Sequence, residues 1–103
     1  MEIVKHVRED GSVLLVASGE IDMATVREVR DVALDSLKST GCAALTIDLR
    51  GVTFVDSTGV GALVAIQNVA HQMGQKLTMF RPSARLMQVL KIAGLDTIFT
   101  IEL

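Results

Sequence analysis

Short apolar runs rich in β-branched residues alternate along the chain with longer amphipathic segments, and this alternation restricts the possible folds most strongly. The first two runs, 2–8 and 12–18, are separated by Asp10-Gly11, a dipeptide that favours a tight hairpin turn. Strands joined by a tight turn pair antiparallel, whereas strands joined through a helix pair in parallel. We therefore predict an α/β fold in which a mixed, mostly parallel sheet with an N-terminal antiparallel hairpin packs against helices.

Capping residues and glycines mark the ends of the expected helices. Asp22 is expected to cap the first helix, Asp56 or Ser57 the second, and Pro82-Ser83 to open the third. The expected helices cover 22–39, 56–73 and 82–94, and the later strands cover 43–49, 76–80 and 97–101, with a turn at Gly51. No linker, repeat or low-complexity tract interrupts the chain, so residues 1–103 are expected to form a single domain.

Composition argues against several classes of function. The 103 residues carry a formal net charge of −2 and include 3 Phe but no Trp or Tyr, so we expect no nucleic-acid binding. The longest apolar run, 59–66, is far shorter than the ~20 residues of a membrane span, and the charged N-terminus does not resemble a signal peptide. Cys42 is the single cysteine, so no internal disulfide can form, and we expect a cytoplasmic protein that does not contact a membrane. We also expect no metal site and no cofactor.

The expected helix after residue 56 is unusual because it carries almost no charge and contains glycine near its start. Segment 57–75 has no formally charged side chain, and only His71 within it can titrate near neutral pH. Gly59 and Gly61 stand in its first turns, where each costs roughly 1 kcal/mol relative to alanine. Burial explains the middle of this helix, whereas its start indicates a close approach, and we expect Gly59 to leave room for a protein kinase.

Three oxygen-bearing side chains, Asp56, Ser57 and Thr58, follow one another where a single helix cap is enough. Free backbone N–H groups at a helix N-terminus favour an anion, and open α/β sheets bind ligands where helices follow strands. A serine in this place is most often a structural cap, but Ser57 is also well placed to receive a phosphoryl group. The residues alone leave both interpretations open.

The segment 48–63, with Asp56-Ser57-Thr58-Gly59 at its centre, resembles the signature of STAS domains, in particular of bacterial anti-sigma factor antagonists. The segment 19–22, Gly-Glu-Ile-Asp, resembles a second motif of this family, and similar residues recur at 76–78, 82–83 and 94–95. The resemblance covers almost the whole chain and implies a single STAS-like domain.

The resemblance implies an interaction protein rather than an enzyme. It implies that the unphosphorylated form binds an anti-sigma factor with serine kinase activity and so releases the sigma factor. Phosphorylation of Ser57 would abolish this complex, and a metal-dependent serine phosphatase would restore it. Thr58, where the family commonly has serine, is a minor rival phosphosite. We include Met23 in the expected partner surface because the flexible methionine side chain adapts to other protein surfaces. The residues expected at the partner surface are Asp22, Met23, Asp56, Thr58, Gly59 and Gly61.

Enzymatic and nucleotide-binding alternatives fit the sequence less well. A serine hydrolase needs glycine two residues before its nucleophile, where Val55 stands, and His71 lies about 21 Å away along a continuous helix. A phospho-aspartate receiver would use Asp56, but the last expected strand carries no lysine. A dinucleotide-binding loop would need a third glycine after Gly61. The remaining alternative is a STAS-type scaffold or accessory subunit of a signalling assembly or transporter, without sigma-factor release.

Overall fold

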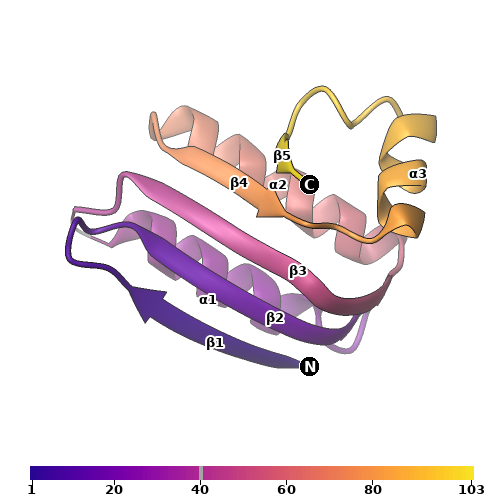
Figure 1. The fold of residues 1–103 in the computed structure, drawn as a ribbon, viewed down its shortest axis with the longest axis horizontal. Helices are drawn as coiled ribbons and strands as arrows, with labels where there is room; N and C mark the ends of the chain where they lie inside the picture. The colour runs from indigo at the N-terminus through magenta and orange to yellow at the C-terminus, as the bar shows by residue number, and fades with distance from the viewer. Residues whose placement is uncertain (40) are drawn as a thin grey trace.

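The computed structural model describes residues 1–39 and 41–103, and the strands in these ranges form a 5-stranded sheet in the order β1-β2-β3-β4-β5 (Figure 1). β1 and β2 pair antiparallel, and all later neighbours pair in parallel. This arrangement confirms the predicted mixed α/β sheet with its N-terminal hairpin. The elements are β1 (Glu2–Val7), β2 (Val13–Ile21), α1 (Val26–Lys38), β3 (Ala44–Val55), α2 (Ser57–Gln72), β4 (Lys76–Phe80), α3 (Ala84–Ile92) and β5 (Thr100–Glu102).

The order of the strands explains why the described helices do not cover both faces of the sheet. The connections β2-α1-β3 and β3-α2-β4 both step in the same direction across the sheet. Since such crossovers are almost always right-handed, they place both helices on one face. Figure 1 shows α1 and α2 side by side behind the strands, while α3 lies beyond the end of the sheet where β3 and β4 terminate.

The core lies between the sheet and the two helices behind it. Alternate residues of β2 and β3 point to this side, as the two-residue period of a strand requires. These side chains meet buried aliphatic residues from α1 and α2, which face them at helical spacing. The principal core residues of the four elements are Val13, Leu15, Ala17, Leu45, Ile47, Leu49, Val29, Ala33, Leu37, Leu63, Ile66 and Ala70.

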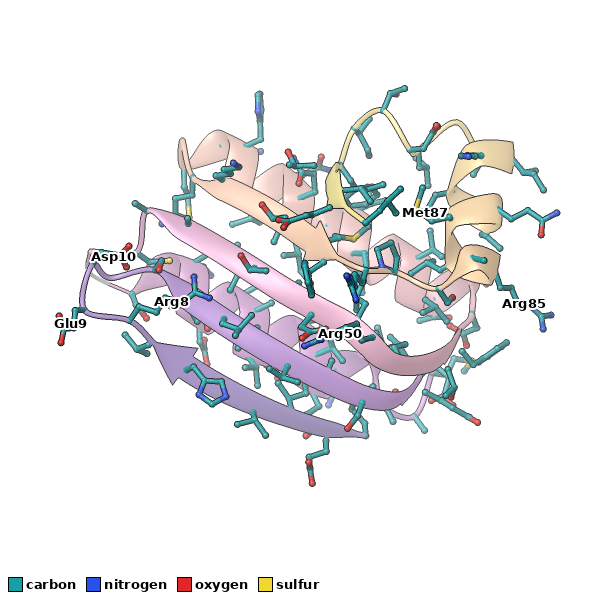
Figure 2. All side chains as sticks on the ribbon, viewed as in Figure 1. Arg8, Glu9, Asp10, Arg50, Arg85 and Met87 are labelled. Atoms are coloured by element: carbon teal, nitrogen blue, oxygen red, sulfur yellow. The ribbon has the colours of Figure 1, made fainter. Side chains whose placement is uncertain are left out.

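The opposite face of the sheet carries an ion pair between Asp48 and Arg50. Asp48 is only 3% exposed, and its Oδ2 accepts a hydrogen bond from Nη2 of Arg50 at 2.8 Å. The hydrogen-bonded Arg50 side chain lowers the pKa of the Asp48 carboxyl below its ordinary value. The Arg50 guanidinium, labelled on the near face of the sheet in Figure 2, lies 5.2 Å from the centre of the Phe80 ring.

Some boundaries differ from the sequence prediction for reasons of tertiary structure. β3 does not end at residue 49 with a turn at Gly51 but continues to Val55, because its second half pairs with the end of β2. Gly51 lies inside the strand, where a Cβ would stand 2.9 Å from that of Ser18. The last strand begins at Thr100 rather than residue 97.

Candidate functional site

Asp56 joins the ends of two strands to the start of α2. Its side-chain Oδ1 accepts a hydrogen bond from the backbone N–H of Gly59 at 2.8 Å, which makes it the N-cap of the helix. Its own backbone N–H donates to the carbonyl oxygen of Ile21 at 3.0 Å. The last residue of β2 and the first turn of α2 are therefore held next to each other by a single residue.

Ser57 is the first residue of α2, and its side chain is exposed. The sequence left open whether Asp56 or Ser57 caps this helix, and the structure gives the cap to Asp56. The Ser57 hydroxyl is therefore not needed to satisfy the helix N-terminus. Thr58 is exposed as well, so both hydroxyls of this turn belong to the surface.

The loop that follows β2 lies beside this turn and is organised by Asp22. Its Oδ1 accepts from the backbone N–H groups of Ala24 at 2.9 Å and Thr25 at 3.2 Å. The hydroxyl of Thr25 also donates to the carbonyl oxygen of Glu20 at 2.7 Å. Asp22 thus shapes a turn before α1, and the helix itself begins at Val26 with Thr25 as its N-cap, later than the sequence predicted.

Met23 is the most prominent apolar side chain of this loop. It is 80% exposed, although methionine is normally a core residue. The β2 strand ends at Ile21, whose partner in β3 is Val55, so Met23 and Ser57 each lie two residues beyond a paired position. Met23, Asp22, Asp56 and Ser57 are therefore brought to the same edge of the sheet.

The two glycines of the first turns have different surroundings. A Cβ at Gly59 would meet Val55 Cγ1 at 2.7 Å, Ile21 Cγ2 at 2.8 Å and the Ile21 carbonyl oxygen at 2.9 Å. Gly59 is buried, so it allows α2 to approach the strands; the expectation that it leaves room for a kinase, and its place among the surface residues, were wrong. Gly61 is exposed, and a Cβ there would have no neighbour within 4 Å.

The electrostatic character of this edge follows from its composition. The unpaired backbone N–H groups at the start of α2 favour an anion, and the cap carboxylate of Asp56 already uses one of them. Asp22 supplies a second carboxylate in the adjacent loop. A further negative group on Ser57 would thus be attracted by the helix terminus and repelled by two neighbouring acids.

The described ranges 1–39 and 41–103 contain no cluster of three or more His, Cys, Asp or Glu side chains positioned to hold a metal ion. Within the same ranges, no helix combines the length and apolar character needed to cross a membrane.

Sequence reasoning overlooked two residues near this edge. Phe54, the penultimate residue of β3, and Val89 of α3 are each 40% exposed and line one shallow depression. The sequence placed Phe54 outside any strand, and no local pattern relates it to a helix 30 residues later. The only signal in the sequence was an aromatic residue three positions before Ser57.

These features define a small α/β domain whose distinctive residues gather where two parallel strands end. The family model described as "Mlab, STAS domain" matches residues 5–102, and the chain belongs to the STAS family.

One curated relative and two solved structures show which individual proteins this chain is similar to. The anti-sigma-B factor antagonist of Listeria monocytogenes is 33% identical over 95 residues, which cover 92% of this chain and 82% of the relative. A solved putative anti-sigma factor antagonist from Thermotoga maritima superposes with a TM-score of 0.86 at 21% identity, covering 97% of this chain and 85% of its own. The Bacillus cell fate determinant SpoIIAA in its phosphorylated form gives a TM-score of 0.77 at 17% identity, with 99% and 92% covered. The two solved structures show that the fold is shared.

Proposed function

We propose that this protein is an anti-sigma factor antagonist whose binding is switched by phosphorylation of Ser57. The observation that carries the proposal is that the first residue of α2 bears an exposed hydroxyl while Asp56 performs the capping. The name of the Listeria monocytogenes relative and the phosphorylated form of the structural relative support this assignment. In this role the protein regulates by binding and carries out no reaction of its own.

The unphosphorylated protein would bind an anti-sigma factor that is also a serine kinase, and the sigma factor would thereby be released. The contact would centre on Ser57 and Thr58 and extend over the loop residues Asp22 and Met23 and the exposed Gly61. Asp56 contributes through its capping role and its charge. Thr58 remains a minor alternative acceptor, because it is exposed in the same turn.

Charge explains how such a switch can work. A phosphoryl group adds about −1.5 to −2 charges at neutral pH. One such charge at ~6 Å from a like charge, at an effective dielectric constant near 20, costs roughly 3 kcal/mol. That energy corresponds to about a hundredfold loss of affinity. In the free protein the helix N-terminus compensates part of this repulsion, so the phosphate would disfavour the complex more than the free domain.

The reverse step would require a metal-dependent serine phosphatase acting on the same exposed position. Because Ser57 stands at the surface, no unfolding of the domain is needed for either enzyme to reach it. The cycle would therefore be controlled by the relative activities of kinase and phosphatase on one side chain.

The test is to incubate the purified protein with ATP and each anti-sigma factor kinase encoded in the genome of its source. Peptide mass spectrometry would locate the phosphoryl group, and calorimetry would compare wild type with Ser57→Asp. We expect label on Ser57 and at least a thirtyfold weaker complex for Ser57→Asp. Equal affinities, or label on Ser83, would refute the proposal. Stable binding to a sensor scaffold or a transporter subunit without phosphorylation would favour the alternative STAS role.

A further inference from the structure

We infer that Phe54 and Val89 form an apolar platform on which the anti-sigma factor kinase docks when it acts on Ser57; this inference rests on the proposed function. Both side chains are 40% exposed and line the same small depression between the end of β3 and α3. The depression is completed by Thr53, Val55, Ser83, Arg85 and Leu86.

These two side chains differ in exposure from the apolar residues of the core. Phe99 is 7% exposed and belongs to the core cluster, whereas Phe54 is 40% exposed and lies outside it. Val89 is likewise outside that cluster, although its neighbours Leu86 and Leu90 are buried in it. Aromatic residues are enriched in the contact surfaces of protein complexes, so an exposed phenylalanine three residues before Ser57 favours such a surface.

The platform lies within reach of any protein that covers Ser57. Phe54 precedes Ser57 by three residues, a distance of at most about 10 Å along the extended chain. A specific protein complex buries about 800 Å² on each partner, equivalent to a disc of about 16 Å radius. Phe54 therefore lies within the radius of an interface centred on Ser57, and we place the kinase over it and over the depression that Val89 lines.

Charge around the platform indicates the chemistry of the partner. Arg85 lines the same depression and is exposed, and Figure 2 shows it projecting outward from the first turn of α3. Asp22, in the loop after β2, and Asp56, the residue before Ser57, supply carboxylates of the opposite charge. A complementary kinase surface presents an apolar side chain to Phe54 and Val89 and a carboxylate to Arg85. Such an arrangement fixes the orientation of the kinase as well as its affinity.

The test uses the full chain and the kinase that labels Ser57 in the experiment above. The variants are Phe54→Ser, Val89→Ser and Arg85→Glu, with Val7→Ser and Ile92→Ser as controls. Val7 is 66% exposed at the opposite end of the sheet, and Ile92 is 80% exposed at the far end of α3. Steady-state phosphorylation would give KM for the protein substrate and kcat separately, after thermal unfolding has established that each variant is folded.

We expect Phe54→Ser to raise KM at least tenfold and Val89→Ser about threefold, with kcat changed less than twofold, because docking is weakened while Ser57 is intact. Arg85→Glu should also raise KM, and both control variants should match wild type. An unchanged KM for Phe54→Ser and Val89→Ser, or an equal rise for Val7→Ser, would overturn the inference and leave the proposed function standing. If Phe54→Ser does not fold, Val89→Ser and Arg85→Glu decide the matter. If no kinase labels Ser57, the proposed function fails first and the platform fails with it.

Discussion

Two helices of this protein begin beside a serine, but only one of these serines is used by the helix. At α3, Ser83 is the N-cap, and its Oγ accepts a hydrogen bond from the backbone N–H of Leu86 at 3.1 Å. At α2, the cap is Asp56, and Ser57 follows as the first helical residue. Both serines are exposed, so exposure does not distinguish them.

The comparison shows that a shift of one residue relative to the helix start changes the role of a serine hydroxyl. A serine at the cap satisfies a backbone N–H that would otherwise lack a partner inside the helix, and modification would disrupt that bond. A serine one residue later leaves the cap intact and carries its hydroxyl at the positive end of the helix. A phosphoryl group on Ser57 would leave the cap of α2 intact, whereas one on Ser83 would disrupt the cap of α3.

The largest expected effect concerns phosphorylation itself. Ser57→Ala should abolish incorporation of phosphate by the cognate kinase, because its acceptor hydroxyl is missing, while Ser83→Ala should be phosphorylated like wild type. Quantitative mass spectrometry of the intact proteins after incubation with ATP measures both. If Ser57→Ala is still fully phosphorylated, the acceptor is Thr58 instead, and the proposed difference in role between Ser57 and Ser83 is wrong.

The next largest effect should come from the glycines that shape the start of α2. Gly59→Ala should lower the free energy of unfolding by about 2 kcal/mol, because the new methyl group overlaps Ile21 and Val55. Gly61→Ala meets no atom within 4 Å and should raise it by about 0.5–1 kcal/mol through helix propensity. Urea denaturation followed by circular dichroism tests both. Equal effects of the two substitutions would contradict the packing described here.

Removal of either helix cap should have an intermediate effect on the free energy of unfolding, and it tests whether Ser57 and Ser83 differ in their structural role. Asp56→Ala and Ser83→Ala should each cost about 1 kcal/mol of unfolding free energy, because each leaves a helix N–H without its partner. Asp56→Asn should cost much less, since asparagine caps equally well, and Ser57→Ala should change stability by less than about 0.5 kcal/mol. A cost for Ser57→Ala as large as for Ser83→Ala, measured by chemical denaturation, would show that Ser57 is also structural.

The smallest expected effect is that of the phosphate on the free domain. An anion at a helix N-terminus stabilises by about 0.3–1 kcal/mol at low ionic strength, and repulsion from Asp56 and Asp22 opposes it. The phosphorylated and unphosphorylated forms should therefore differ in unfolding free energy by less than about 1 kcal/mol. Calorimetric melting at low and high salt would measure this difference. A phosphorylated form that is several kcal/mol less stable would mean that the switch acts by unfolding and not by charge.

Much of the fold was predictable because its signals are local. The limits of β4 were predicted correctly at Lys76 and Phe80, and Asp56 and Ser83 were recognised as caps or helix openers. A cap depends on a side chain and a backbone N–H three residues away. Such short-range relations can be read directly from the chain.

The errors have a common physical origin in contacts between distant segments. Gly51 was assigned to a turn because glycine is common there, but pairing with β2 keeps it inside β3. Gly59 was assigned to the surface, but Ile21, far away in the sequence, packs against it. The ion pair of Asp48 and Arg50 was also not predicted, because its strength depends on the burial of Asp48 in the sheet.

The sequence alone was enough to predict the order of strands and helices, the opening of α3 at Ser83 and the segment that carries Ser57. These follow from periodicity and from short-range hydrogen bonds, which act over a few residues. Tertiary contacts determine that Asp56 rather than Ser57 caps α2, that Gly59 is buried against Ile21, and that Phe54 and Val89 line the same depression. Those features depend on how parallel strands and crossover helices bring remote residues to one edge of the sheet.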